Sequence, residues 1–333
     1  MRIIDMHCDT INELMKDDKL ILRQNDLMID LVKLRKNDYL LQCFAMFVRY
    51  IRDDIPNYNP FEYCNKMIDK YYIEIEKNKD LIRPVFCYND ILDNIKNNRL
   101  SSLLTIEEGG VCLGNIEFLR NFYRLGVRMI TLTWNYKNEL ASPNIDYTNL
   151  DTHTRDGLIF YPNLVDGLTE KGIEFVHEMN KLGIVIDCSH LGDKGFYDVI
   201  KYSNKPIVCS HSCSRHVCNH VRNMTDDMLF KLKDNGGVVG INFCHDFCVD
   251  DDRFCTIDDC IKHIVHIRDL IGIDYIGLGS DFDGIGNSKI ELKDATVMPR
   301  LIEKLREYGF SEEDIDKICY KNVLRVFKAN FDY

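Results

Sequence analysis

Residues 2–10 read RIIDMHCDT, a short apolar run that leads into a histidine and a carboxylate two positions apart. In a β-strand alternate side chains share one face, so we expect His7 and Asp9 to point the same way. An imidazole nitrogen and a carboxylate oxygen together suit zinc and similar divalent ions. The stretch therefore predicts one half of a metal site at the end of a buried strand. We expect Cys8, which lies between the two, to face the opposite side, pack against helices and bind no metal.

Seven further apolar runs of strand length follow, and they alternate with segments in which apolar residues recur at helical spacing. The strand-like runs are residues 39–48, 100–106, 127–133, 184–187, 206–209, 237–243 and 275–278, and the helical segments are residues 60–77, 89–97, 116–125, 168–182, 225–235, 257–271, 295–308 and 311–328. This alternation indicates parallel β/α architecture, and eight units favour a closed barrel over an open sheet. Because no linker, internal repeat or low-complexity block interrupts the pattern, we predict an α/β fold with a single (β/α)8 TIM-like barrel domain over residues 1–333.

The composition excludes several classes of partner. With 45% hydrophobic and 29% charged residues, the chain has the profile of a globular protein. Its net charge of −11 argues against a nucleic-acid partner, because non-specific affinity for nucleic acid comes from Lys and Arg. The first residues lack the apolar core of a secretory signal, and no run is long enough to span a bilayer. We therefore expect a cytoplasmic protein with no nucleic-acid or membrane partner.

The fourteen cysteines show no regular framework, and none forms a CxxC pair. In a cytoplasmic chain this scatter favours reduced, mostly buried thiols over a cysteine-based zinc knuckle or a disulfide scaffold.

Metal-competent side chains gather at the C-terminal ends of the predicted strands. In a closed barrel these ends converge on the face that carries the active site. Taken alone, each residue has a plainer interpretation: a lone histidine is more often a satisfied core residue, and acidic residues beside glycines often form turns. The joint pattern favours a metal site, because polar residues placed at random would not all choose the same end of the strands. The candidates are His7, Asp9, Glu108, His190, His211 and Asp281.

Three histidines and three carboxylates exceed the needs of one four-coordinate ion. Two ions that share a bridging carboxylate and a bridging water would use them, and such pairs activate hydroxide for hydrolysis at neutral pH. The residues therefore predict a two-metal hydrolytic site.

Motifs along nearly the whole chain resemble the membrane dipeptidase (renal dipeptidase, peptidase M19) family of amidohydrolase-like metal-dependent hydrolases. The matching pieces are DMHCDT (5–10), LQCFAMF (41–47), TIEEGG (105–110), GVRMITLTWN (126–135), GLTEKGIEFVHEMNKLGIVIDCSH (167–190), PIVCSHS (206–212), HVRNMTDDML (220–229), IGLGSDFDG (276–284) and KICYKNVLRVF (317–327). The resemblance implies that His7 and Asp9 hold one zinc ion, that His190 and His211 hold the other, and that Glu108 bridges the two. Other divalent metals could take the place of zinc, because His and carboxylate ligands also serve them.

The resemblance also assigns roles in binding and catalysis. Arg222 matches the family arginine that binds the terminal carboxylate of the substrate, although an arginine seen alone is as well explained by a surface ion pair. Asp281 matches the aspartate that passes a proton from the attacking water to the leaving amine. Glu107 has no role in the family pattern that can be carried over. In the best-known members a histidine follows the Leu-Thr pair of the fourth strand, whereas here Trp134 stands in that place, as in a second, largely bacterial branch. We expect Trp134 to form a wall of the substrate pocket in preference to core packing.

These inferences lead to a binuclear zinc dipeptidase in which a metal-bridging hydroxide attacks the peptide bond of a small dipeptide. Two alternatives stay open: a metal-dependent amide or lactone hydrolase that acts on a non-peptide metabolite, and a catalytically weak metal-binding barrel. The long loop over residues 136–162 is expected to help set the substrate. The resemblance also suggests a homodimer.

Overall fold

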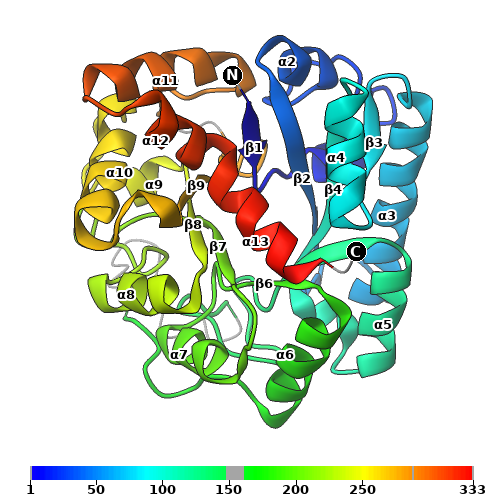
Figure 1. The fold of residues 1–333 in the computed structure, drawn as a ribbon. Helices are drawn as coiled ribbons and strands as arrows, with labels where there is room; N and C mark the ends of the chain where they lie inside the picture. The colour runs from blue at the N-terminus through cyan, green and yellow to red at the C-terminus, as the bar shows by residue number, and fades with distance from the viewer. Residues whose placement is uncertain (1, 148–160, 287–288, 332–333) are drawn as a thin grey trace.

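Eight parallel strands close into a ring in the structure, a computed structural model that describes residues 2–147, 161–286 and 289–331 (Figure 1). The ring closes where β9 pairs with β1, with Leu278 opposite Asp5. All eight strands fall on apolar runs picked out in the sequence, so the prediction of a (β/α)8 barrel is confirmed. In ring order they are β1 (Ile3–Asp5), β2 (Tyr39–Phe47), β4 (Leu100–Glu107), β5 (Val127–Thr131), β6 (Val185–Asp187), β7 (Val208–Ser212), β8 (Val238–Ile241) and β9 (Ile276–Leu278).

A ninth strand, β3 (Ile82–Pro84), pairs with residues 100–102 of β4, ahead of the point where β5 joins β4. The sequence analysis did not predict this strand. It has only three residues and ends in a proline, which cannot donate a hydrogen bond to a neighbouring strand.

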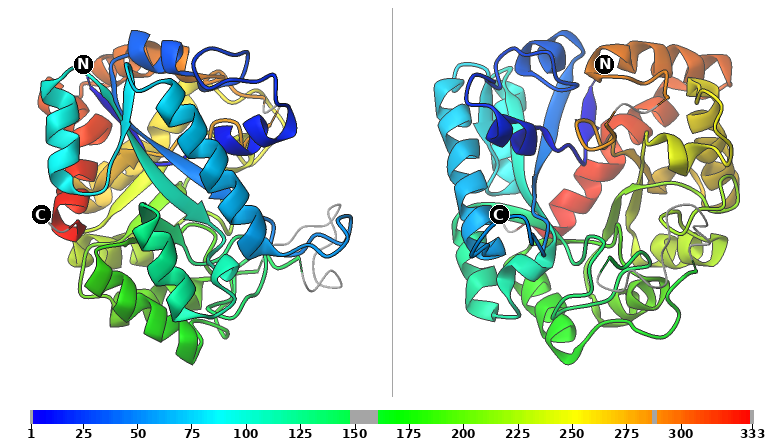
Figure 2. Two further views of the ribbon diagram at one scale, coloured as in Figure 1. Left: turned by 90° about the vertical axis from the view of Figure 1, so that its right-hand side faces the viewer. Right: turned by 180° about the vertical axis from the view of Figure 1, so that it is seen from behind.

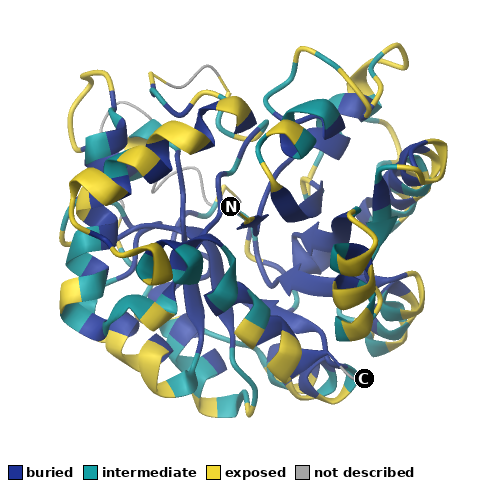
Figure 3. Ribbon diagram, turned by 45° about the horizontal axis from the view of Figure 1, so that its top comes forward, coloured by how far each residue is buried: buried dark blue, intermediate teal, exposed yellow. Residues whose placement is uncertain are grey.

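Helices surround the ring and turn their exposed sides to solvent (Figure 3). Several begin where a side chain accepts a hydrogen bond from the first turn, as Asn59, Thr169 and Thr225 do. Their bounds are α1 (Thr10–Lys16), α2 (Leu31–Lys36), α3 (Pro60–Lys77), α4 (Tyr88–Lys96), α5 (Ile116–Arg124), α6 (Glu170–Leu182), α7 (Asp193–Tyr202), α8 (Asp226–Asn235), α9 (His245–Cys248), α10 (Ile257–Ile271), α11 (Met298–Glu307), α12 (Glu312–Asp316) and α13 (Asn322–Asn330).

The core has two parts, one inside the ring and one between the ring and the helices. The inner cluster gathers residues near the beginnings of strands, such as Val185 and Val208, and includes Val323 and Phe327 of α13. Helix α13 therefore closes the end of the barrel at which the strands begin (Figure 1). The opposite end, where the strands finish, is left for a functional site.

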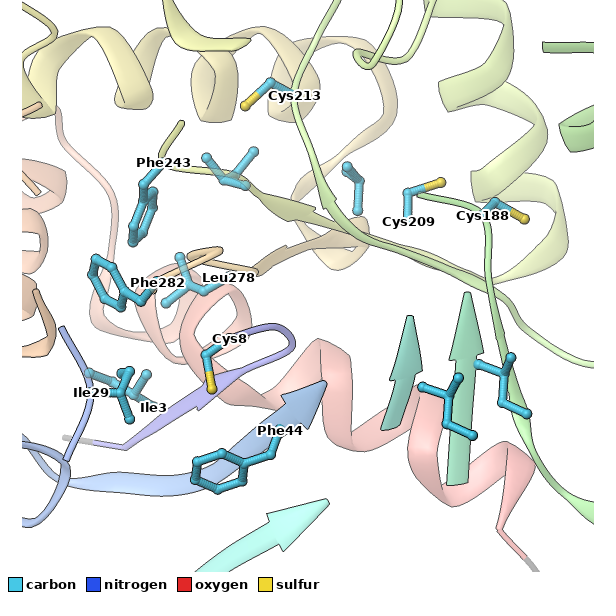
Figure 4. Packing of buried hydrophobic residues seen from close by; sticks show 14 of the residues in the cluster. Ile3, Cys8, Ile29, Phe44, Cys188, Cys209, Cys213, Phe243, Leu278 and Phe282 are labelled. Carbon is cyan, nitrogen blue, oxygen red and sulfur yellow. The ribbon is translucent and has the colours of Figure 1, made fainter. Parts of the chain in front are cut away.

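The outer cluster contains Cys8, which Figure 4 shows near Phe44, Leu278 and Phe282. Its thiol donates to the carbonyl oxygen of Cys43 at 3.4 Å. The prediction that Cys8 packs into the core outside the ring is confirmed. All fourteen cysteines are free thiols, and all but Cys87 and Cys244 are buried. In the described residues, no helix combines the length and the apolar character that a membrane span needs.

Candidate metal centre

Glu107, the last residue of β4, is the carboxylate around which three histidines gather. Its Oε1 lies 3.0 Å from Nε2 of His190 and 3.5 Å from Nε2 of His211. Its Oε2 lies 3.3 Å from Nε2 of His7, which is in turn 3.6 Å from Oδ2 of Asp9. One oxygen of Glu107 therefore faces the His190–His211 pair and the other faces the His7–Asp9 pair, as expected of a carboxylate between two ions.

The prediction that Glu108 occupies this position is wrong. Its Oε1 accepts hydrogen bonds from the backbone N–H of Gly110 at 2.8 Å and from the side-chain amide of Asn138, and its Oε2 accepts from the backbone N–H of Trp134 at 3.0 Å. Both oxygens are thus committed to the loop that follows β5. Burial raises the pKa of Glu108 to about 7.

Strand geometry explains why the neighbouring residue takes the central place. Leu103 belongs to the inner cluster, whereas Leu104 and Ile106 belong to the outer one. Because side chains alternate along a strand, Glu107 shares the inward face with Leu103, and Glu108 does not. The strand ends at Glu107, and the backbone turns at Glu108 with a φ of 96°.

The Nε2 atoms of His190 and His211 face each other, each with an unprotonated lone pair. Their Nε2 atoms lie 3.0 Å apart. The Nδ1 of His190 lies 2.9 Å from Oδ1 of Asn135, which can only accept a hydrogen bond, so Nδ1 carries the proton. The Nδ1 of His211 lies 2.8 Å from the hydroxyl of Ser210, which already donates to Asp187, so this Nδ1 is also the donor.

Burial lowers the pKa of His190 to about 4 and holds that of His211 well below its usual range, so both rings are neutral at pH 7. Two unprotonated nitrogens at this distance repel each other unless a cation lies near both. The pair therefore fits a metal ion of the kind that imidazole nitrogen binds.

The half-site at His7 also favours a cation. Nε2 of His7 and Oδ1 of Asp9 are buried and have no hydrogen-bond partner. Burial opposes a charge on His7, but Glu107 and Asp9 outweigh it and hold the pKa of this histidine well above its usual range. Asp281 completes the half-site, with Oδ1 at 3.9 Å from Nε2 of His7. Positive charge at this position is thus stabilised by three carboxylates.

Glu107 is ionised in this environment. Burial would raise its pKa, but the surrounding histidines, His7 first, hold the pKa well below the usual range. The donor set of five side chains around one ionised carboxylate exceeds the four ligands that a single tetrahedral ion takes.

Three residues at the site adopt left-handed backbone conformations that are uncommon outside glycine. They are Glu108 after β4, His190 after β6 and Asp281 after β9, with φ values of 96°, 67° and 62°. Such conformations cost about 1–3 kcal/mol each and persist only where the surroundings enforce them. Here each lies where a strand ends, and the sharp turn directs the chain across the mouth of the barrel.

A cavity of about 410 Å³ opens over the centre. Glu107, His190 and Asp281 lie at its base, and Phe47 and Trp134 form part of its wall. The ring of Trp134 packs edge-on against that of Phe47, with centroids 4.9 Å apart. Trp134 thus lines this cavity, and its contact with substrate stays a prediction. The segment between β2 and α3, which projects from the body in Figure 2, supplies Arg49 to the rim.

Arg222 is buried beside the cavity and retains free hydrogen-bonding capacity. Its Nη2 donates to the carbonyl oxygen of His211 at 3.3 Å, whereas its buried Nε has no partner. The guanidinium lies 5.2 Å from the ring centroid of Phe247, a residue that lines the cavity. Burial lowers the pKa of Arg222, and Asp281 and Glu107 oppose that effect. The plainer interpretation, a surface ion pair, does not fit a guanidinium that is 5% exposed.

Sequence reasoning missed two groups that orient the histidines, besides Glu107. Asn135 holds His190, and the Ser210–Asp187 pair holds His211. Both lie in quoted motifs, TLTWN and IDCSH–PIVCSHS, directly beside residues that were singled out. A further neighbour, Asn242, donates to Oδ2 of Asp281 at 2.9 Å. The loop over residues 136–162 lies partly outside the described residues, so the prediction that it helps set the substrate is not tested.

Comparisons with known proteins agree with this geometry. The model of the membrane dipeptidase family (Peptidase family M19) matches residues 1–332. An uncharacterised dipeptidase of Schizosaccharomyces pombe is 34% identical over 90% of the chain, which spans 71% of that protein. Dipeptidase 3 of Mus musculus is 35% identical over 71% of the chain, which spans 46% of that protein.

Among solved structures, a metallopeptidase of Rhodobacter sphaeroides, liganded with a phosphinate mimic of the dipeptide L-Ala-D-Ala, superposes with a TM-score of 0.88 at 23% identity, over 99% of each chain. This likeness supports the fold. Because the family model covers nearly every residue, the chain belongs to the membrane dipeptidase family, peptidase family M19, and is a hydrolase of the metallopeptidase class.

Proposed function

We propose that this protein is a binuclear zinc dipeptidase. The proposal rests on the position of the Glu107 carboxylate between the histidines. Its Oε1 faces His190 and His211, and its Oε2 faces His7. In this proposal Glu107, not Glu108, is the shared ligand. His7 and Asp9 hold one ion, and His190 and His211 hold the other.

Bound at these residues, the two ions would supply a hydroxide nucleophile at neutral pH and polarise the scissile carbonyl. The protein's own part is to fix the ligands and to shape the cavity above them. The hydrogen bonds from Asn135 and Ser210 serve the first purpose, because they set the tautomer that leaves Nε2 of each histidine free.

Asp281 is positioned to take up and return a proton. It lines the cavity beside His7, and burial raises its pKa to about 7 in the metal-free protein. Its Oδ2 is held by Asn242, which leaves Oδ1 directed toward the half-site at His7. We assign to Oδ1 the proton that leaves the attacking water and later reaches the leaving amine.

Arg222 would bind the terminal carboxylate of the substrate. An arginine that is buried, charged and without an ion-pair partner among the described residues fits an anionic group brought in by a ligand. Phe247, on which the guanidinium lies, borders the cavity, so a substrate carboxylate would reach Arg222 past this ring. Trp134 and Phe47 would contact the apolar part of the dipeptide.

The proposal is tested by measuring metal content and hydrolysis together. The purified chain is assayed against dipeptides with free and amidated C-termini, and with L and D residues at the second position, including L-Ala-D-Ala. We expect at least two equivalents of metal, hydrolysis of free dipeptides that stops when a chelator removes the metal, and recovery on adding Zn²⁺. Activity that survives complete metal removal would contradict the mechanism. Hydrolysis of non-peptide amides or lactones in place of dipeptides would favour the other hydrolase chemistry. The cytoplasmic location and the homodimer stay predictions.

A further inference from the structure

A second group of potential ligands lies away from Glu107, in the part of the barrel formed by α9 and α10, which pack side by side (Figure 1). Cys248 ends α9, Cys255 lies in the loop that follows, and Cys260 lies in the first turns of α10. The three Sγ atoms lie within 4.8 Å of one another, and all three residues are buried. Three thiols from one stretch of 13 residues thus converge on one point.

The spacing of the sulfur atoms suits a shared metal ion. The Sγ atoms of Cys248 and Cys260 are 3.6 Å apart. With a Zn–S distance of about 2.3 Å, two thiolates on a tetrahedral ion lie about 3.8 Å apart, whereas a disulfide brings them to about 2.05 Å. The thiols of Cys248 and Cys260 therefore stand near the separation that a tetrahedral ion requires, and well beyond that of a covalent bond.

A fourth thiol lies next to Cys248 but is not grouped with Cys255 and Cys260. Cys213, which follows β7 and appears near Phe243 in Figure 4, has its Sγ within 4.8 Å of that of Cys248. Both thiols donate to the carbonyl oxygen of Asn242 at 3.3 Å, so they share one acceptor and lie on the same side of the cluster. His263 also lies near, but the Ser214 N–H reaches its Nδ1 and its Nε2 contacts the carbonyl oxygen of Cys248, so neither nitrogen is free.

We propose that Cys248, Cys255 and Cys260 form a three-thiolate binding site for a soft d10 cation, Zn²⁺ or Cu⁺. Thiolates select such ions over the harder cations that carboxylates prefer. Binding replaces the thiol protons with the metal, and the protons leave to solvent.

The site would fasten the loop beside the active-site cavity. Cys248 directly follows Phe247, which lines the cavity. The backbone carbonyl of Asn242 accepts hydrogen bonds from the thiols of Cys213 and Cys248, and the side chain of Asn242 donates to Asp281. An ion at the thiols would tie α9 to α10 and so hold this wall of the cavity. The inference does not depend on the dipeptidase proposal.

The test uses Co²⁺ as a spectroscopic substitute for Zn²⁺. The full chain, purified under reducing conditions, is titrated with Co²⁺ while thiolate-to-cobalt charge-transfer absorption is followed. Ions held by histidine and carboxylate give no such band, so the active site does not interfere. We expect the intensity of the band at saturation to correspond to about one thiolate-bound ion per chain, and the band to be lost in Cys260→Ser and retained in Cys319→Ser, a buried cysteine outside the cluster.

A second measurement keeps the inference testable if Cys260→Ser fails to fold. The unaltered chain is treated with a thiol alkylating agent under partial denaturation, with and without Zn²⁺ or Cu⁺, and the modified cysteines are mapped by mass spectrometry. We expect either ion to protect Cys248, Cys255 and Cys260 at least tenfold, with Cys319 unchanged. Protection by Cu⁺ alone would assign the site to Cu⁺. Absence of both the band and the protection, or a Cys248–Cys260 disulfide in the purified chain, would overturn the proposal.

Discussion

Replacing Glu107 and Glu108 by glutamine, one at a time, tests whether the two adjacent carboxylates have different functions. Glu107→Gln keeps the shape of the side chain but removes the charge that faces both halves of the centre. Loss of an outer partner of a metal ligand costs roughly 10–100-fold in metal affinity. Because Glu107 contacts His7, His190 and His211 directly, we expect at least about 100-fold weaker metal binding, which is about 2.7 kcal/mol.

Glu108→Gln provides the matched control at the neighbouring position. Burial raises the pKa of Glu108 from 4.5 to about 7, so ionisation of this side chain costs the folded state about 3 kcal/mol, and the amide removes that cost. In the opposite direction, the –NH2 group of the new amide would face an N–H donor that the carboxylate oxygen accepted from. Losing that hydrogen bond destabilises the folded state by about 1.5–3 kcal/mol. The two effects nearly cancel, so we expect the free energy of unfolding to change by less than about 2 kcal/mol and the metal to stay bound.

Both variants are dialysed against a weak chelator and examined by elemental analysis, thermal unfolding and dipeptide hydrolysis. We expect Glu107→Gln to fold, to lose metal and to lose hydrolysis, and Glu108→Gln to keep both. The reverse pattern, in which Glu108→Gln loses the metal and Glu107→Gln retains it, would refute the assignment of Glu107 as the shared ligand.

Three other predictions concern the proton, the substrate and pH. Asp281→Asn should keep the metal yet lower kcat by at least about 100-fold, since it removes the proton carrier; unchanged kcat with full metal content would exclude that role. Arg222→Met should raise KM for dipeptides with a free C-terminus, with little change for C-terminal amides, whereas an equal loss for both would point to a structural role. Burial lowers the pKa of His263 from its ordinary value of 6.5 to about 4. The unfolded chain therefore binds a proton at this residue before the folded chain does, and the folded state loses stability as the pH falls from 6.5 toward 4. In urea unfolding of the metal-free protein, His263→Gln should therefore be less pH-dependent than the unaltered chain between pH 6.5 and 4, by about 3 kcal/mol; identical slopes would contradict this.

The barrel was predictable from the sequence because each of its eight strands is a short apolar run bounded by polar residues, as in the stretch before His7. The histidines and Asp281 were predictable for the related reason that polar residues at strand ends converge when a barrel closes. Helix α7 (Asp193–Tyr202) was missed, although Phe196 and Val199 lie three positions apart on its buried face.

The choice between Glu107 and Glu108 depended on a one-residue difference that strand alternation could have settled. Counting in steps of two from Leu103, an inward-facing residue, leads to Glu107. The following glycines and the family motif drew attention to Glu108 instead. The groups that orient the histidines, such as Asn135, could not be identified in this way, because their contacts form only when separate strands come together. The cluster at Cys248 carries no CxxC spacing, because its thiols come from α9, the loop that follows it and α10.

The most direct test of the account is an anomalous-diffraction map at the zinc absorption edge from crystals grown with Zn²⁺. At the centre around Glu107 we expect two peaks about 3.5–4 Å apart, separate from any peak at Cys248, Cys255 and Cys260; one lies beside His7 and Asp9 and the other beside His190 and His211, with the carboxylate of Glu107 between them. A single peak at the centre, or two peaks joined by Glu108, would contradict it.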